Sequence, residues 1–208
     1  MIHPFEFNPQ VVVLANGDYP SHPLAINQLT QAPAVICCDG AADAYIARGG
    51  RPVAIIGDGD SLSSHVRSAY SELIIRVEEQ ETNDLTKAMH HAHSLGWTRI
   101  LILGATGKRE DHTLGNISLL GDYLQWGGEV RMFTDQGVFV PVVNEGCFHL
   151  GQGQKVSVFN FDTTGLQATG LAYPLYDFDR WWQGTLNTAV ADTVTIRGRG
   201  RFLVYLPY

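Results

Sequence analysis

Two acidic side chains that stand two residues apart provide the clearest sign of chemistry in this chain. Asp58 and Asp60 lie in the segment Gly57–Ser61, directly after the apolar run Val53–Ile56. A buried strand that ends this way brings negative charge to the carboxyl edge of a sheet, where open α/β folds bind ligands. Neighbouring carboxylates repel each other unless a cation lies between them, and oxygen ligands suit Mg²⁺. We therefore predict a magnesium site that handles phosphate.

Two further polar segments follow apolar runs in the same way. Asp39–Asp43 comes after Ala34–Cys38, and Gly104–His112 comes after Ile100–Leu103. Glycines in the second segment allow close approach of the backbone to a ligand, and the helix that follows offers free N–H groups to an anion. Its Arg109 adds a planar guanidinium that matches phosphate oxygens. Both segments are expected at the same edge of the sheet.

A fourth polar segment begins a predicted helix. Thr82 or Asn83 is a natural N-cap, so Asp84 starts the helix and Lys87 lies one turn further on the same face. Taken singly, each of the four segments is more often a turn or a helix cap than a binding site. Their common placement at strand ends favours one joint site, with an acid for the metal and a base for the phosphates.

The elements that must position these segments alternate along the first two-thirds of the chain. The predicted strands are Val11–Ala15, Ala34–Cys38, Val53–Ile56, Leu73–Val77, Ile100–Leu103 and Val130–Phe133. The predicted helices are Ala41–Arg48, Asn83–Ser94 and Asp111–Gln125. Apolar runs without polar alternation indicate strands covered on both faces. We predict an α/β fold with a Rossmann-like parallel sheet and helices on both of its faces.

The last third of the chain lacks helical periodicity and predicts a small all-β, sandwich-like domain. Its predicted strands are Lys155–Phe161, Gly165–Ala172, Thr193–Arg197 and Phe202–Leu206, separated by glycine or polar turns. We expect two domains, an α/β domain of residues 1–143 and a β domain of residues 144–208.

Composition narrows the range of partners. The chain has 208 residues, 45% of them hydrophobic, and a net charge of −7. This charge argues against binding to nucleic acid or to anionic membranes. No signal peptide and no apolar stretch of membrane-spanning length is apparent, so we expect a cytoplasmic protein. The odd number of cysteines, with Cys37 and Cys38 adjacent in an apolar run, predicts buried thiols and no disulfide framework.

Read together, the motifs resemble those of the thiamine pyrophosphokinase family. The matching segments, in the family's order, are Asn16–Asp18, Asp39–Ala41, Gly57–Ser61, Thr82–Ala88 and Gly104–Asn116. Further along, Gly153–Phe159, Gly170–Leu175 and Gly184–Asn187 resemble its second domain. Two residues differ from the usual pattern: Lys108 stands where glycine is frequent, and Leu186 where a serine is usual.

The resemblance implies Mg²⁺-dependent transfer of the pyrophosphoryl group of ATP to thiamine, which gives thiamine diphosphate and AMP. It also implies a homodimer in which each active site joins the α/β domain of one subunit to the β domain of the other. We assign Asp58, Asp60 and Asp84 to the metal and, with Arg109, to catalysis. The residues assigned to nucleotide binding are Asn16, Asp39, Gly40, Ala41, Ser61, Thr82, Asn83, Lys87, Gly104, Ala105, Thr106, Gly107, Arg109, Asp111, His112 and Asn116.

Thiamine is assigned to the C-terminal domain, to Trp181, Trp182, Thr185 and Asn187. Neighbouring residues of an extended segment face opposite ways, so we expect one tryptophan to pack inward and the other to face the ligand. An indole face attracts the positively charged thiazolium ring, and Trp182 is favoured for this role.

Two alternatives stay open. A metal-dependent phosphohydrolase would use the same acidic cluster but would release phosphate without a second organic substrate. A non-catalytic homologue that binds thiamine or a nucleotide would keep the fold without turnover, and Leu186 is the residue that favours it.

Overall fold

The computed structural model describes residues 1–208 and divides into two compact units. The α/β unit contains Asn8–Leu119 and Trp126–Asp135. The β unit contains Met1–Phe7, Leu120–Gln125 and Gln136–Tyr208. A mixed α/β fold with a C-terminal β region is confirmed. The boundary predicted after residue 143 falls inside the strand β7 (Gly137–His149), so the observed division comes earlier in the sequence.

The α/β unit is built on parallel strand pairs. Its strands are β1 (Val11–Leu14), β2 (Val35–Cys38), β3 (Ala54–Gly57), β4 (Ile74–Arg76), β5 (Arg99–Leu103) and β6 (Glu129–Phe133). They lie in the order β6-β5-β1-β2-β3-β4, and every neighbouring pair is parallel. All residues of β1, β2 and β3 are buried, which is why these strands read as unbroken apolar runs.

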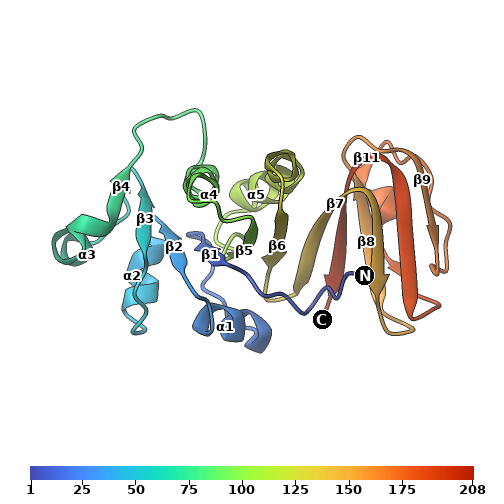
Figure 1. The fold of residues 1–208 in the computed structure, drawn as a ribbon, viewed down its shortest axis with the longest axis horizontal. Helices are drawn as coiled ribbons and strands as arrows, with labels where there is room; N and C mark the ends of the chain where they lie inside the picture. The colour runs from blue at the N-terminus through green and yellow to red at the C-terminus, as the bar shows by residue number, and fades with distance from the viewer. The chain divides into compact units, whose positions relative to one another are not determined.

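The helices of this unit cover both faces of its strands. They are α1 (Pro23–Thr30), α2 (Ala41–Ile46), α3 (Ser64–Ala69), α4 (Asp84–Ser94) and α5 (Glu110–Tyr123). Figure 1 shows α1 and α2 on one side of the strands and α4 and α5 on the other. The sequence predicted α2, α4 and α5 but not α1 or α3, since α1 buries only Ala25 and Leu29 and α3 buries only Val66.

The strand order reverses at β1, whose neighbours are β5 on one side and β2 on the other. The chain therefore leaves β1 and β5 in opposite directions, and a crevice opens between their carboxyl ends. Ligands of open α/β sheets bind at this kind of switch point. The loops after β1 and β5 are thus the natural walls of a site.

The β unit consists of antiparallel pairs. Its strands are β7, β8 (Lys155–Asn160), β9 (Thr164–Thr169), β10 (Asn187–Thr188) and β11 (Thr193–Pro207). Both β7 and β8 pair with β11, β9 pairs with its first half, and β10 pairs with β8. The longest of these strands is β11, with 15 residues, which Figure 1 shows in red.

One sequence prediction in this unit is wrong. The two short strands expected at Thr193–Arg197 and Phe202–Leu206 are parts of the single strand β11. Its pairing with β7 shifts register between Arg197 and Arg201. Glycines interrupt the apolar pattern at this irregularity, and such an interruption looks like a turn in the sequence.

No helix of the structure has both the length and the apolar character that a membrane crossing would need.

Candidate functional site

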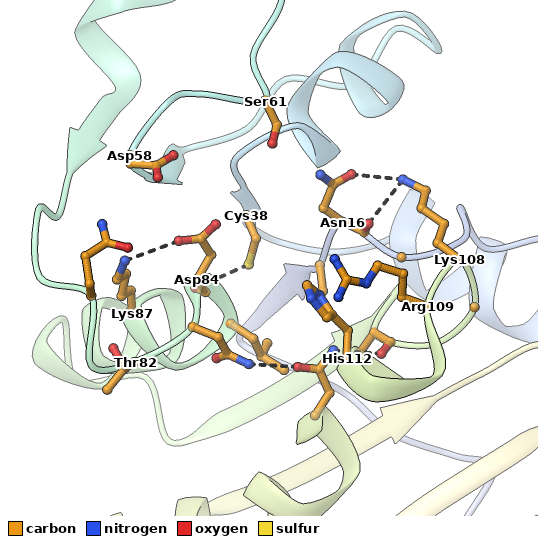
Figure 2. A pocket seen from close by; sticks show the side chains of 18 residues that line it. Asn16, Cys38, Asp58, Ser61, Thr82, Asp84, Lys87, Lys108, Arg109 and His112 are labelled. Carbon is orange, nitrogen blue, oxygen red and sulfur yellow. Dashed lines mark hydrogen bonds and ion pairs between the residues drawn. The ribbon is translucent and has the colours of Figure 1, made fainter. Parts of the chain in front are cut away.

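A cavity of about 430 Å³ opens at the carboxyl ends of the parallel strands. Segments that follow β1, β3, β4 and β5 form its walls, together with Cys38 at the end of β2 and the starts of α4 and α5. Figure 2 shows Asp58, Asp84 and Lys87 on one side of it and Lys108, Arg109 and His112 on the other. The lining residues are Ala15, Asn16, Gly17, Cys38, Asp58, Ser61, Gln80, Thr82, Asn83, Asp84, Leu85, Lys87, Ala105, Gly107, Lys108, Arg109, His112 and Asn116.

Three carboxylates converge on the acidic side of this cavity. Asp58 and Asp84 line it, and Asp39 lies behind them with only 3% of its surface exposed. Gly57 makes the convergence possible, because a Cβ at this position would lie 2.9 Å from the Asp39 Cβ and 3.4 Å from the Asp84 Cγ. Burial raises the pKa of Asp84, and the negative charges of Asp39 and Asp58 raise it further, whereas Lys87 lowers it.

The carboxylate of Asp39 has an unsatisfied oxygen. Its Oδ2 accepts a hydrogen bond of 2.9 Å from the backbone N–H of Ser61, but its buried Oδ1 has no hydrogen-bond partner. An orphaned buried acceptor beside two further carboxylates fits a cation. No group of three acidic, histidine or cysteine side chains is arranged to hold a metal alone. Mg²⁺ needs no such group, because it binds one or two carboxylates together with water and substrate phosphates.

The start of α4 places one acid and one base as the sequence predicted. Asn83 is the N-cap, and its side chain accepts a hydrogen bond of 2.9 Å from the backbone N–H of Thr86. The Nζ of Lys87 lies 3.5 Å from Oδ1 of Asp84, one turn earlier. Lys87 is only 7% exposed, so its charge is directed at the cavity and not at bulk water.

Asn116 connects three parts of the site. Its Oδ1 accepts a hydrogen bond of 3.0 Å from the Nδ2 of Asn83, and its own Nδ2 donates to the carbonyl of Ala105 at 2.8 Å. Asn116 is 9% exposed. This buried amide therefore ties the start of α4 to α5 and to the glycine-rich loop after β5.

The loops after β1 and β5 are packed backbone to backbone. The N–H of Gly17 donates to the carbonyl of Gly104 at 2.7 Å, and the N–H of Asp18 donates to the carbonyl of Thr106 at 2.8 Å. A Cβ on Gly17 would collide with both of these carbonyl oxygens. Glycine is required here because the two loops approach so closely.

Arg109 lies at the exposed rim of the cavity, where Asp111 holds it. Its Nε and Nη2 donate to the two carboxylate oxygens of Asp111 at 3.1 and 2.5 Å. The hydrogen bond with Arg109 is the main reason why the pKa of Asp111 is lowered. Asp111 itself does not line the cavity, so its place in the site is that of a support for Arg109.

The cavity includes most of the residues assigned from the sequence, but not all of them. Of the residues assigned to the metal, to catalysis or to the nucleotide, those outside its lining are Asp39, Gly40, Ala41, Asp60, Gly104, Thr106 and Asp111; the four assigned to thiamine also lie outside it. The backbone N–H of Asp60 donates to Oδ1 of Asp58 at 3.0 Å, while the exposed Asp60 side chain is not part of the wall. The lining residues that the sequence assignment missed are Ala15, Gly17, Cys38, Gln80, Leu85 and Lys108.

Comparison with known proteins shows which family the chain belongs to. Residues 26–132 match the model of the thiamin pyrophosphokinase catalytic domain, and residues 137–205 match that of the thiamin pyrophosphokinase substrate-binding domain. The chain belongs to the thiamin pyrophosphokinase family. The lining of the cavity from Cys38 to Asn116 falls within the part that matches the catalytic domain.

Individual relatives agree with this family. A curated thiamine pyrophosphokinase of Bacillus subtilis is 29% identical over 133 residues, which span 60% of this chain and 62% of the relative, less than two thirds of its length. The crystal structure of the B. subtilis thiamine pyrophosphokinase superposes with a TM-score of 0.80 at 23% identity, over 95% of this chain and 98% of that one. Thiamin pyrophosphokinase from Candida albicans gives 0.80 at 18% identity, over 99% and 92%. At these identities the two structures show a common fold.

The adjacent tryptophans lie in the part that matches the family's substrate-binding domain. The sequence predicted an extended segment here, but the two tryptophans form the start of a short 3₁₀ helix, Trp181–Gly184. Trp181 packs edge-on against the rings of Phe159 and Phe161, with centroids 5.8 and 6.1 Å away. Trp182 is 70% exposed. Trp181 keeps these ring contacts although it is 39% exposed, and the two rings diverge because consecutive residues of a 3₁₀ helix lie about a third of a turn apart.

The side chains of the other two residues assigned to thiamine form hydrogen bonds with backbone groups in this structure. Asn187 is 5% exposed, and its amide bonds both the N–H and the carbonyl of Tyr173, at 3.1 and 2.9 Å. The Oγ1 of Thr185 donates to the carbonyl of Trp182 at 2.7 Å. Thr185 therefore holds the backbone at Trp182, whereas Asn187 holds the backbone at Tyr173.

Replacement of Asn116 tests whether the buried amide holds the site together. Asn116→Ala should reduce the free energy of unfolding by about 1–3 kcal/mol, because it leaves the Ala105 carbonyl and the Asn83 amide without their partner. Urea denaturation measures this. Ser118→Ala is the matched control, since Ser118 also donates to a carbonyl of α5 but is exposed. Equal stabilities of the two variants would contradict a structural role for Asn116.

Proposed function

We propose that this protein transfers the pyrophosphoryl group of ATP to the hydroxyl of thiamine, with Mg²⁺, and releases thiamine diphosphate and AMP. One observation carries the proposal: a single cavity, within the match to the family's catalytic domain, has carboxylates on one side and cations on the other. A polyphosphate chelated to a divalent cation requires both kinds of charge at once.

The acidic side chains are the proposed metal ligands. Asp58 and Asp84 face the cavity, Asp39 lies directly behind them, and Asp60 follows as the second carboxylate of the motif. A Mg²⁺ ion bound there would neutralise part of the negative charge of the phosphates. Transfer to a hydroxyl is mainly a matter of positioning and charge stabilisation, so the protein needs no covalent intermediate.

The cations of the cavity wall are the proposed phosphate-binding groups, with Lys87 beside the carboxylates and Arg109 on the opposite side. Lys87 and Arg109, with the backbone of Gly104–Gly107 and the start of α5, would hold the phosphates so that the hydroxyl attacks the β-phosphorus in line with the departing AMP. Other proposed contacts to the nucleotide are Asn16, Ser61, Thr82, Asn83, Ala105, His112 and Asn116, with Asp39, Gly40, Ala41, Thr106 and Asp111 as supports.

Thiamine is proposed to bind in the β unit, for which we propose a sandwich-like arrangement, and the nucleotide in the α/β unit, for which we propose a Rossmann-like one. Trp182 offers an exposed indole face, a surface that attracts an organic cation by about 0.5–2 kcal/mol. Trp181 and Thr185 keep its segment in place, and Asn187, which holds the backbone of Tyr173, is the fourth residue proposed for this site. We propose a cytoplasmic homodimer in which Trp182 of one subunit completes the site of the other.

The two rivals differ from this proposal in their products. A phosphohydrolase would release inorganic phosphate from ATP without thiamine. A non-catalytic homologue would bind its ligands without turnover, and the exposed Leu186, which has left-handed backbone with φ 62°, is the feature that favours it.

Product analysis decides between these functions. Incubation with ATP, Mg²⁺ and thiamine should yield AMP and thiamine diphosphate in equal amounts, and chelation of Mg²⁺ should stop the reaction. Chromatography of the mixture measures both products. Release of ADP, or of phosphate without thiamine, would overturn the proposal in favour of a hydrolase or another transferase.

Substitution of the acidic residues tests the metal assignment. Asp58→Asn, Asp60→Asn and Asp84→Asn should each lower kcat by about 10²–10³. Each variant replaces a positioned carboxylate by an uncharged amide of similar size. Asp43→Asn is the matched control, because the Asp43 carboxylate accepts a hydrogen bond from Ser63 outside the cavity. A soluble variant of the three with near-normal kcat at limiting Mg²⁺ would remove that residue from the metal site.

Subunit mixing tests the position of Trp182. Trp182→Ala should raise KM for thiamine far more than for ATP. If each site is shared across a two-fold dimer, a mixture of Trp182→Ala with Asp84→Asn, assayed with thiamine far below the KM of Trp182→Ala, should regain about a quarter of wild-type activity, because half of the dimers are hybrids with one intact site each. Absence of recovery, with subunit exchange verified by mass spectrometry, would place the site within one chain or make Trp182 a packing residue.

A further inference from the structure

Lys108 is the one cation of the cavity wall that has no acidic partner. Of the other two, Lys87 lies 3.5 Å from Asp84 and Arg109 lies 2.5 Å from Asp111. The Nζ of Lys108 instead donates to the carbonyl and the Oδ1 of Asn16, at 3.1 and 3.0 Å. Both acceptors are uncharged, so Lys108 has no ion pair within the cavity wall.

The backbone presents this side chain to the cavity at a conformational cost. Lys108 has φ 57°, in the left-handed region that side-chain-bearing residues uncommonly occupy, and it follows Gly107 at φ 79°. The N–H of Arg109 donates to the carbonyl of Gly107 at 2.7 Å and closes a tight turn around Lys108. The turn directs Lys108 across to the loop after β1, where Figure 2 shows it beside Asn16.

An ammonium group has three donors, and two of those of Lys108 are used on Asn16. The third donor, on an ammonium group that has no ion pair, remains for an anion. Lys108 lies on the side of the cavity opposite the carboxylates Asp58 and Asp84. An anion between the two sides would therefore meet Lys108 on one flank and metal-binding carboxylates on the other.

We propose that Lys108 binds a nonbridging phosphate oxygen of the nucleotide polyphosphate and determines how tightly the enzyme holds it. This inference rests on the proposed function for the identity of the ligand. The same contact also couples the phosphate to Asn16, so that the loop after β1 is fixed when the polyphosphate is bound.

Binding of Mg²⁺ with inorganic tripolyphosphate, measured by calorimetry, tests this without turnover. Lys108→Met removes the charge, keeps the length and keeps a non-glycine residue at the same φ. It should weaken tripolyphosphate and ATP about tenfold, whereas Lys108→Arg should stay close to wild type. The salt dependence of binding should also become weaker in Lys108→Met, because one exposed charge no longer contributes.

The control for net charge is Arg51→Met, since Arg51 is exposed and outside this cavity. Lys108→Gly, which relieves the left-handed backbone, serves if Lys108→Met does not fold, and it should weaken binding to the same extent. Affinities for tripolyphosphate that equal those of wild type and Arg51→Met would overturn the inference and leave Lys108 as a clamp on Asn16. Loss of affinity in an enzyme that forms no thiamine diphosphate would support Lys108 and overturn only the proposed function.

Discussion

Repulsion among carboxylates is the constraint on which the rest of this structure depends. Asp39, Asp58 and Asp84 come from three different segments, yet the fold brings their charges close enough for the first two to raise the pKa of the third. Lys87 compensates only part of this charge, and the buried Oδ1 of Asp39 has no partner. Repulsion within such a cluster destabilises the folded protein, and destabilising groups of this kind concentrate at functional sites, where a bound ligand offsets the repulsion.

The sheet and its glycines are what make the cluster possible. The parallel strands β1, β2 and β3 end at the same edge of the sheet. Because the strand order reverses at β1, the loops after these strands and the loop after β5 meet around one cavity. Gly57 lets the side chains of Asp39 and Asp84 approach each other, and Gly17 lets the loop after β1 lie directly on the loop after β5. The buried amide of Asn116 then joins this pair of loops to α4. This packing places the carboxylates on one side of the cavity and the cations Lys108 and Arg109 on the other.

The sequence predicted the parts whose residues are set by burial. The strands of the α/β unit were found within a residue or two, because runs such as Val11–Leu14 are buried on both faces. The cap at Asn83 was found because capping depends on local chemistry alone. Short helices such as α3 were missed, since Val66 is its only buried residue and gives no periodicity.

Side-chain directions in loops could not be predicted, because no period governs them. Asp60 was expected to face the metal with Asp58, but its side chain is outside the cavity wall. Lys108 was not assigned to the site, although the left-handed turn brings its side chain into the wall. The helical turn at Trp181–Gly184 was likewise taken for extended chain, since two adjacent tryptophans have no preference strong enough to decide.

The most direct test of this account is a calorimetric titration with α,β-methylene ATP, a nucleotide that cannot lose AMP, in the presence of Mg²⁺ and in the presence of EDTA. If the carboxylate cluster exists to hold a cation together with a polyphosphate, the wild-type protein should bind the nucleotide more tightly with Mg²⁺, and Asp84→Asn should lose this gain. Equal affinities of the wild-type protein under the two conditions would contradict the account.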